Sequence, residues 1–257
     1  MLTHPTIEKL HEMRLLGMAK ALEEQVRPAQ ADLYAPMSFE ERFGLIVDRE
    51  RTYRAANQLA LRLHKAKLRQ NAACEDIDFK AARGLDRAAL VSLCQPDWIE
   101  RHENCLITGP TGVGKSFIAC AIGHKACRDG KRVLYTRASR LFPELAIAKA
   151  DGSHGRRLLA LAKLDLLIID DWGLAPLTAE HARDFLEILD DRYDLRSSLV
   201  VSQLPVDHWH AVMPDPTVAD AALDRLVHNA HRIVLKGESA RKLRARASLT
   251  QQAQTEA

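Results

Sequence analysis

The sequence lacks any apolar run of about 18 residues, the length that a membrane-spanning helix needs. Its first residues, Met1-Leu-Thr-His-Pro, also lack the charged-then-apolar pattern of an export signal. We therefore expect a cytoplasmic protein that has no membrane partner.

Cysteine is scarce, and its spacing fits none of the common metal motifs. The five cysteines are odd in number and form no C-x-x-C pair, which argues against a zinc site. Three of them lie within apolar stretches, so we predict reduced thiols in the interior of a cytosolic protein. The five cysteines of the chain are Cys74, Cys94, Cys105, Cys120 and Cys127.

A large excess of one charge is missing too. The net charge is +3 at neutral pH, so any surface for nucleic acid must be a local one. In other respects the composition is ordinary for a globular protein. The chain of 257 residues is 47% apolar and 28% charged, and it is long enough for one or two domains.

The most informative stretch runs from Asn104 to Ser116, where a short apolar strand precedes a glycine-rich turn. The turn fits G-x-x-x-x-G-K-[ST], the pattern of a loop that holds nucleotide phosphates, and a helix is predicted after it. Glycines let backbone N–H groups point inward at phosphate oxygens, and the helix N-terminus adds partial positive charge. The predicted ATP-binding residues are Gly109, Pro110, Thr111, Gly112, Val113, Gly114, Lys115 and Ser116.

Two of these residues carry predicted chemistry. Lys115 places a positive charge between the β- and γ-phosphates of ATP, and the Ser116 hydroxyl can bind Mg²⁺. A glycine-rich turn with a surface lysine is the alternative. The strand before the turn and the helix after it favour the nucleotide site.

A second motif, Leu166 to Asp171, consists of four apolar residues followed by two carboxylates, the pattern called Walker B. A buried strand of this kind delivers Asp170 to the sheet edge beside the phosphate loop, where it can hold Mg²⁺ directly or through water. Asp171 can then polarise the attacking water as a general base. The alternative is an ordinary buried strand with a polar end.

Two more residues are catalytic candidates, each with a plainer alternative. Gln203 follows the predicted strand that ends at Ser202, so it can reach the γ-phosphate or the attacking water, or merely cap the strand. Arg225 lies beside Leu226 on a predicted helix and can face the nucleotide of a neighbouring subunit, or form a surface salt bridge.

The run from Arg49 to Arg69 is basic, with only Glu50 as a counter-charge. A solvated helix face is the usual explanation of a charge run, but charges of one sign repel one another, and phosphate contacts relieve that repulsion. Apart from Tyr53 no aromatic residue interleaves, so base stacking is not indicated. The predicted DNA-binding residues are Arg49, Arg51, Arg54, Arg62, Lys65, Lys67 and Arg69.

The order of predicted elements gives the fold class. Apolar periodicity predicts a helix over residues 3–25, and Ser38-Phe-Glu-Glu41 resembles a capping box that starts a second helical stretch. Further on, strands near 131–136, 165–169, 198–202 and 231–235 alternate with helices, which predicts a mostly parallel sheet covered on both faces. We predict a small all-helical N-terminal domain, residues 1–75, and an α/β ATP-binding domain, residues 76–257.

With these motifs in place, the chain resembles the AAA+ ATPases of the IstB type, which are helper proteins of one group of bacterial insertion sequences. These are similar to DnaC-type helicase loaders. The resemblance extends into Met13–Met18 and Arg62–Leu68, and so covers nearly the whole chain. It rests on Gly-Pro-Thr-Gly-Val-Gly-Lys-Ser116, Leu-Leu-Ile-Ile-Asp-Asp-Trp-Gly173, Val-Ser-Gln-Leu-Pro-Val-Asp-His-Trp-His210 and Ala-Asp-Ala-Ala-Leu-Asp-Arg-Leu-Val-His228, with Lys-Gly-Glu-Ser239 after it.

The resemblance implies an ATP-driven homo-oligomer of the bacterial cytoplasm. Such a protein binds double-stranded target DNA through its N-terminal and central parts, and recruits or activates a cognate transposase. By the same resemblance Gln203 looks like the sensor residue, and Arg225 looks like an arginine finger that completes the neighbour's site.

Two departures from the wider AAA+ pattern leave alternatives open. Asp171 stands where many AAA+ proteins have Glu, and the shorter side chain predicts slow hydrolysis. About 20 residues follow Leu235, so we expect the C-terminal lid to be absent or truncated, and its arginine to be absent or replaced within Arg241 to Arg246. A nucleotide-switched DNA-binding scaffold with negligible hydrolysis and a helicase loader are the competing functions.

Overall fold

The computed structural model describes residues 5–79, 84 and 86–237. Its contacts divide the chain into two compact units, Met1–Leu61 and Arg62–Ala257. The division falls within one long helix, and the domain boundary near residue 75 stays a prediction. No helix in the described ranges is long and apolar enough to cross a membrane.

The first unit is helical, as predicted. It contains α1 (Pro5–Glu12), α2 (Leu16–Gln25), the 3₁₀ turn η1 (Pro28–Gln30), α3 (Ala31–Tyr34) and the first part of α4 (Phe39–Ala66). The single helix expected over residues 3–25 is two helices instead, because Arg14 adopts a left-handed conformation with φ of 58°. Ile7, Leu10 and Ala19 form the small core of this unit.

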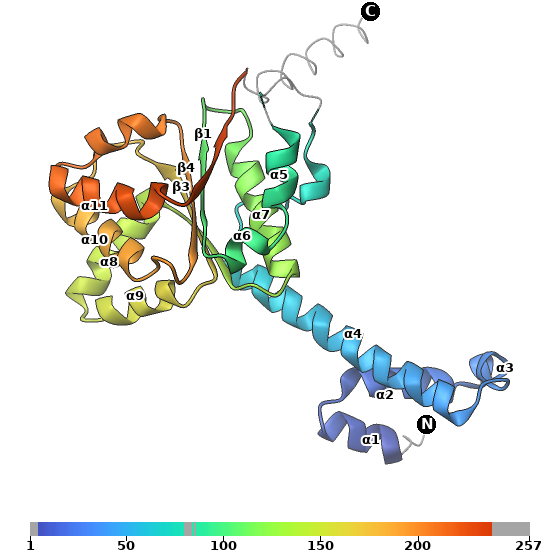
Figure 1. Ribbon diagram of the computed structural model, residues 1–257. Helices are drawn as coiled ribbons and strands as arrows, with labels where there is room; N and C mark the ends of the chain where they lie inside the picture. The colour runs from blue at the N-terminus through green and yellow to red at the C-terminus, as the bar shows by residue number, and fades with distance from the viewer. Residues whose placement is uncertain (1–4, 80–83, 85, 238–257) are drawn as a thin grey trace, which may run out of the picture. The chain divides into compact units, whose positions relative to one another are not determined.

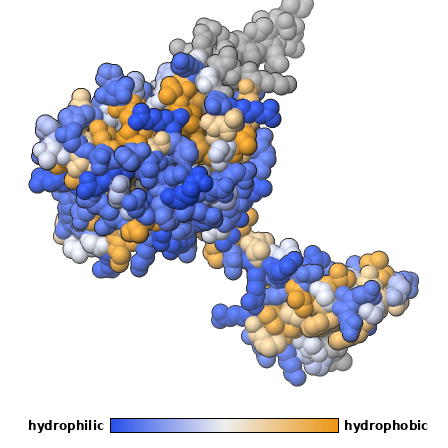
Figure 2. Space-filling model, viewed as in Figure 1, coloured by the Kyte–Doolittle hydropathy of each residue, from blue (hydrophilic) through white to orange (hydrophobic). Residues whose placement is uncertain are grey.

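The start of α4 confirms the predicted capping box. The Ser38 N–H donates to Glu41 Oε2 at 2.7 Å, and the Glu41 N–H donates to Ser38 Oγ at 3.2 Å. The first turns of α4 expose large apolar side chains: Phe39 and Phe43 stack with ring centroids 5.9 Å apart, and Phe39 is 72% exposed. Figure 2 shows apolar surface on this unit among hydrophilic residues.

A buried carboxylate joins α4 to α2. Glu50 Oε2 accepts hydrogen bonds from the backbone N–H groups of Gly17 and Met18, at 2.7 and 3.0 Å, and so caps the start of α2. The close approach requires Gly17, because a Cβ there would lie 2.6 Å from Glu50 Cα. Burial raises the pKa of Glu50. Hydrogen bonds from Arg54, Met18 and Gly17 lower it by more than burial raises it, so the net shift of the pKa is downward.

Five parallel strands form the sheet of the second unit, which confirms the predicted α/β class. They are β1 (Asn104–Thr108), β2 (Val133–Arg137), β3 (Leu166–Trp172), β4 (Ser197–Ser202) and β5 (Ala230–Val234). Their order is β2-β3-β4-β1-β5, and each neighbouring pair is parallel. The carboxyl ends of all five strands therefore meet at one edge of the sheet, where open α/β sheets place their ligands.

Helices cover both faces of this sheet (Figure 1). One face carries α5 (Arg87–Leu93), α6 (Asp97–Glu100) and α7 (Lys115–Arg128). The other carries α8 (Ala138–Ala150), α9 (His154–Ala162), α10 (Ala179–Asp190) and α11 (Pro216–Val227). On that second face Trp172 stacks on Phe185, with ring centroids 4.1 Å apart, within the larger core cluster.

Short 3₁₀ turns complete the second unit at Cys74–Asp76 (η2), Val206–His208 (η3) and His210–Val212 (η4). The helices and strands predicted for this unit are all present, with ends that differ by a few residues. The segment Arg241 to Arg246, and with it the expected absence of a lid, lies outside the described residues.

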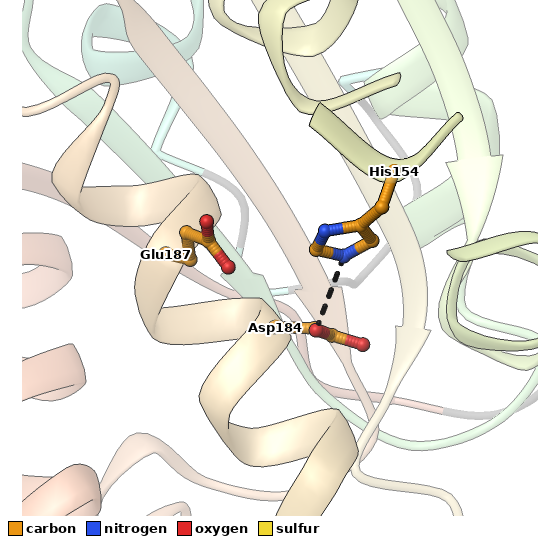
Figure 3. A group of neighbouring side chains, drawn as sticks. All are labelled: His154, Asp184 and Glu187. Atoms are coloured by element: carbon orange, nitrogen blue, oxygen red, sulfur yellow. Dashed lines mark ion pairs between the residues drawn. The ribbon is translucent and has the colours of Figure 1, made fainter. Parts of the chain in front are cut away.

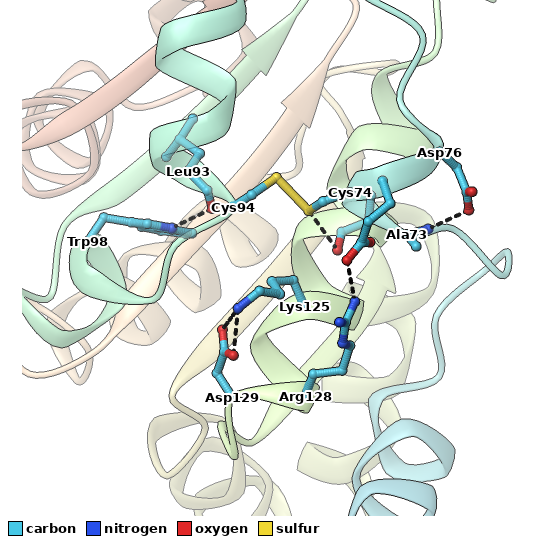
Figure 4. Close-up of a disulfide and its surroundings, with 11 residues drawn as sticks. Ala73, Cys74, Asp76, Leu93, Cys94, Trp98, Lys125, Arg128 and Asp129 are labelled. Carbon is cyan, nitrogen blue, oxygen red and sulfur yellow. Dashed lines mark hydrogen bonds and ion pairs between the residues drawn. A yellow bond between two sulfur atoms is a disulfide. The ribbon is translucent and has the colours of Figure 1, made fainter.

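The predicted state of two cysteines is wrong. Cys74 and Cys94 form a disulfide, which joins η2 to the end of α5 (Figure 4). Cys74 Sγ also contacts the carbonyl oxygen of Ala121 on α7 at 3.5 Å. The remaining three, Cys105, Cys120 and Cys127, are free and buried as predicted.

Candidate functional site

The phosphate-loop motif lies between β1 and α7, at the carboxyl edge of the sheet. Three of its glycines adopt left-handed backbone conformations, with φ of 140° at Gly109, 88° at Gly112 and 103° at Gly114. At Gly109 the space is closed as well, because a Cβ would lie 2.3 Å from the carbonyl oxygen of Leu235. The sequence therefore uses glycine where the loop must both turn and touch the end of β5.

Lys115 is the first residue of α7, and its side chain folds back into the loop. Its ammonium donates to the carbonyl oxygens of Gly109 and Pro110, at 2.7 and 2.8 Å. Burial lowers the pKa of Lys115, while Asp170 and Asp171 oppose that shift, and the net shift is downward. The ammonium of Lys115 is thus held where phosphate oxygens are expected, and it interacts electrostatically with the carboxylates of Asp170 and Asp171.

The two Walker B carboxylates stand near the end of β3. Asp170 is 1% exposed, and both of its oxygens accept hydrogen bonds. The Tyr135 hydroxyl donates to Oδ2 at 2.5 Å, and the Asp171 N–H donates to Oδ1 at 2.7 Å. A carboxylate has about four acceptor positions, so each oxygen of Asp170 keeps one for a metal ion or water.

A β-bulge turns Asp171 away from the regular strand. The pairing of β3 with β4 shifts register between Ile169 and Trp172, and Asp171 has a left-handed backbone with φ of 58°. Its carboxylate is half-buried and lies 3.5 Å from Arg137 Nε, at the end of β2. The bulge thus gives the two neighbouring carboxylates different surroundings, one buried and one facing an arginine.

Gln203, just after β4, contacts the phosphate loop directly. The Thr111 hydroxyl donates a hydrogen bond to Gln203 Oε1 at 2.6 Å. Its neighbour Ser202 has a structural role instead, since its hydroxyl donates to the Trp172 carbonyl at 2.8 Å and accepts from the Leu204 N–H at 3.0 Å. Of the two polar residues at this strand end, the structure brings only Gln203 to the loop.

Arg225 is not part of the site of its own chain. It lies near the end of α11. The side-chain amide of Asn104, the first residue of β1, donates to the backbone carbonyls of Arg225 and Leu226, each at 3.2 Å. These bonds place the end of α11 beside the amino end of β1. The phosphate loop follows the opposite end of β1. The guanidinium forms an ion pair with Asp190 and donates to the Ala221 carbonyl at 2.8 Å, so the salt bridge given as the alternative is present.

A cavity of about 450 Å³ opens beside the first half of the phosphate loop. Gly109, Pro110 and Gln203 line it on the loop side. An apolar wall next to basic groups can hold an organic anion. The apolar wall is formed by Leu106, Val206, Val234 and Leu235; the basic groups are Arg232 and Lys236, and the acidic Asp207 also lines the cavity.

Part of the basic run on α4 is paired within the first unit. Arg49 pairs with Glu24 at 2.8 Å, Arg51 with Asp48 at 3.5 Å, and Arg54 with Glu50 at 2.6 Å. The expectation that Glu50 is the only counter-charge is therefore wrong, because Glu24 comes from another helix and Asp48 lies just before the run.

The later part of the run belongs to the second unit. Arg62 Nε donates to the Cys127 carbonyl at 2.9 Å, and so fastens the end of α4 to α7. Lys65, Lys67 and Arg69 are exposed and form no ion pair with any other described residue. Arg62 has no ion pair among the described residues either, but the Cys127 carbonyl holds its guanidinium. Lys65, Lys67 and Arg69 are therefore the exposed cations of the run that no described group holds in an ion pair.

Figure 3 shows a second cluster of polar side chains, in which one member comes from α9 and two from α10. His154, Asp184 and Glu187 offer ligand atoms within 4.8 Å of one another, and His154 Nε2 lies 3.5 Å from Asp184 Oδ1. However, Lys149 Nζ lies 2.6 Å from the same oxygen and 2.9 Å from Glu180 Oε1. The buried Asp184 is thus already neutralised by a cation, and we assign the cluster a structural role.

Tyr135 and Arg137 are the residues of this site that motif reasoning missed. Both lie on β2, and the register that pairs Arg137 with Asp170 places them beside the carboxylates. The available signal is that β2, like β4, ends in a polar residue at the sheet edge where β3 carries its two carboxylates.

Comparison with known proteins agrees with this geometry. The family described as IstB-like ATP binding protein matches residues 8–248. An insertion-sequence ATP-binding protein of Sinorhizobium fredii is 52% identical over 248 residues, which cover 96% of this chain and 100% of that protein.

Two solved structures share the fold at low sequence identity. The replication initiator DnaA, bound to AMPPCP and single-stranded DNA, has a TM-score of 0.55 at 18% identity, over 67% of this chain and 52% of that one. The DnaC helicase loader has a TM-score of 0.51 at 16% identity, over 68% and 99%. With the family match and the close relative, the chain belongs to the family of IstB-like ATP-binding proteins.

Proposed function

We propose that this protein is an ATPase that assembles on double-stranded DNA and recruits or activates the transposase of an insertion sequence. The observation that carries the ATPase is the convergence of Lys115, Asp170 and Gln203 on one loop at the sheet edge. The name of the Sinorhizobium relative, an insertion-sequence ATP-binding protein, supports the setting in transposition.

In the proposed reaction Lys115 exchanges its two backbone carbonyls for phosphate oxygens. Ser116 and Asp170 fit a Mg²⁺ ion, because a hydroxyl and a carboxylate with free acceptor positions are its preferred ligands. When bound, that ion supplies charge neutralisation at the phosphates. Asp171 accepts the proton of the attacking water, and Gln203 orients that water.

The position of Arg225 supports assembly. It lies at the amino end of β1, opposite its own phosphate loop, and its side chain is one-third exposed. A neighbouring subunit can therefore receive this arginine, provided that the ion pair with Asp190 opens. An arginine supplied in trans stabilises charge on the transferred phosphoryl group, so hydrolysis depends on assembly.

Lys65, Lys67 and Arg69 are the proposed core of the DNA contact, with Arg49, Arg51, Arg54 and Arg62 as flanking positions. Exposed cations without acidic partners gain most from phosphate, because no intramolecular ion pair must be broken. Such contacts to the backbone bind DNA of any sequence.

A nucleotide-switched scaffold is the second candidate. The contact of Asp171 with Arg137 favours it, because the ion pair occupies a carboxylate oxygen that would otherwise accept from the attacking water. Release of phosphate from ATP, measured with and without duplex DNA, separates the two functions. The ATPase proposal expects DNA-stimulated turnover. Normal assembly on DNA without any turnover would favour the scaffold.

The helicase-loader alternative shares the fold of the DnaC structure, which is a likeness of fold alone. Pull-down of the purified protein with the transposase encoded beside it, and separately with a replicative helicase, distinguishes the two partners. Binding to the helicase alone would contradict the transposition proposal.

A further inference from the structure

From β2, the Tyr135 side chain forms a hydrogen bond with Asp170. The length of the tyrosine side chain explains how its hydroxyl reaches the carboxylate. Register pairs Tyr135 with Ile168 and Arg137 with Asp170, so Tyr135 lies two residues short of the carboxylate, on the same face of the sheet. Two residues of a parallel strand span about 6.6 Å, which a tyrosine hydroxyl can bridge and a serine or threonine cannot. The resulting hydrogen bond to Oδ2 is 2.5 Å long.

The bond fixes the orientation of the Asp170 carboxylate. A phenol is a neutral donor, so it orients the carboxylate without cancelling the negative charge that a cation needs. Together with the Asp171 N–H on Oδ1, the Tyr135 hydroxyl holds both ends of the carboxylate and thereby its plane.

We propose that Tyr135 is a positioning residue for the metal ion of the nucleotide: its hydroxyl holds the Asp170 carboxylate in the orientation that binds Mg²⁺. The inference rests on the proposed function, in which Asp170 is the metal carboxylate. Substitution of a residue that hydrogen-bonds a metal-binding carboxylate typically lowers the affinity for the metal by roughly 10- to 100-fold. Tyr135 thereby links the edge strand β2 to a site built by β1 and β3.

The test is a titration of Mg²⁺ against the full-length protein with a fluorescent ATP analogue. Tyr135→Phe removes only the hydroxyl, and we expect it to raise the half-saturating Mg²⁺ concentration roughly tenfold. Affinity for the analogue in EDTA stays at the wild-type value. A merely structural role would change the melting temperature and both affinities together.

Thr136→Val is the matched control. Thr136 is the next residue on β2 and is also buried. The substitution removes a hydroxyl that points to the opposite face of the sheet and donates to the Arg137 carbonyl at 3.4 Å. We expect its Mg²⁺ titration to match the wild type. An unchanged half-saturation in Tyr135→Phe would overturn the inference.

The proposed function fails in a distinguishable way. If wild type and Asp170→Asn both bind the analogue without any dependence on Mg²⁺, the metal site itself is refuted, and the role of Tyr135 with it. Should Tyr135→Phe not fold, 3-fluorotyrosine at position 135 keeps the shape and makes the hydroxyl more acidic. The half-saturating Mg²⁺ concentration then shifts, and the absence of any shift would overturn the inference.

Discussion

The Thr111 hydroxyl donates a hydrogen bond to Gln203 Oε1 at 2.6 Å, which joins the phosphate loop to the end of β4. The bond occupies the amide oxygen of Gln203 and leaves its NH₂ group as the donor toward the loop. A residue that touches the loop in this way can respond to the γ-phosphate.

Gln203→Ala is expected to lower ATP turnover by about 100-fold, because a lost polar group at the reacting phosphate typically has an effect of this size. Binding of a fluorescent ATP analogue should change by less than about twofold. Thr111→Val is the control: it removes the same hydrogen bond but keeps the Gln203 amide. We expect it to lower ATP turnover by less than Gln203→Ala does. Wild-type turnover in Gln203→Ala would show that the residue only caps the strand.

Lys115→Ala should abolish ATP-dependent assembly, because the variant lacks the charge that binds the β- and γ-phosphates. Oligomer size is measured by light scattering with and without ATP. Lys125→Ala, on the same helix but paired with Asp129 at the surface, should assemble normally. If Lys115→Ala still grows in size with ATP, the loop does not drive assembly.

Arg225→Ala is expected to keep nucleotide binding but reduce turnover by roughly 1,000-fold, the typical effect of an arginine supplied in trans. The matched control is Arg183→Ala, since Arg183 also bonds the carbonyl four residues earlier on its own helix. Mixing Arg225→Ala with Asp171→Asn, which keeps the loop that assembly needs, should restore part of the activity, because some interfaces then contain an intact Asp171 and an intact arginine. A mixture as inactive as its components would argue against a role in trans.

Reversal of charge at Lys65, Lys67 and Arg69 to glutamate should weaken duplex DNA binding and flatten its dependence on salt. Each lost phosphate contact lowers the slope of log K against log salt by about 0.9. The control reverses three exposed cations of the α/β unit, Arg156, Lys163 and Arg183, and so changes the net charge equally. Equal effects of the two triple variants would mean that net charge alone is responsible.

The first unit should lose stability in acid through Glu50. Its folded pKa lies below the ordinary 4.5, so the ionised carboxylate stabilises the fold above that pH. The stabilisation disappears as the pH falls through the lower folded pKa. The protection factors of the Gly17 and Met18 amides, which are exchange rates corrected for the intrinsic effect of pH, should therefore fall in that range. In Glu50→Gln they should already be low at neutral pH and change little in acid. Wild-type protection factors that stay constant through this range would contradict the capping role.

Local signals predicted the parts of the site that lie next to one another in the chain. The loop from Gly109 to Ser116 and the strand that ends in Asp170 are each contiguous, and apolar runs of this kind identify buried parallel strands. Strand ends at one sheet edge then predict that Gln203 approaches the loop, as the structure shows.

Features that depend on register or on distant segments could not be predicted in this way. Tyr135 reaches Asp170 only because of the pairing of β2 with β3, and Glu24 pairs with Arg49 only because two helices pack together. The Cys74–Cys94 disulfide likewise joins positions that no spacing rule connects. The break between α1 and α2 comes from the left-handed backbone of Arg14, which the periodicity of apolar residues does not predict.

The contact between Gly109 and Leu235 makes the last described strand sensitive to the nucleotide. The Leu235 N–H also donates to the Thr108 carbonyl at 2.8 Å, so one hydrogen bond and one close backbone contact join the start of the phosphate loop to the end of β5. A displacement of the loop when ATP binds must therefore be passed to β5 through Leu235. The nucleotide site and this edge strand of the sheet are mechanically coupled.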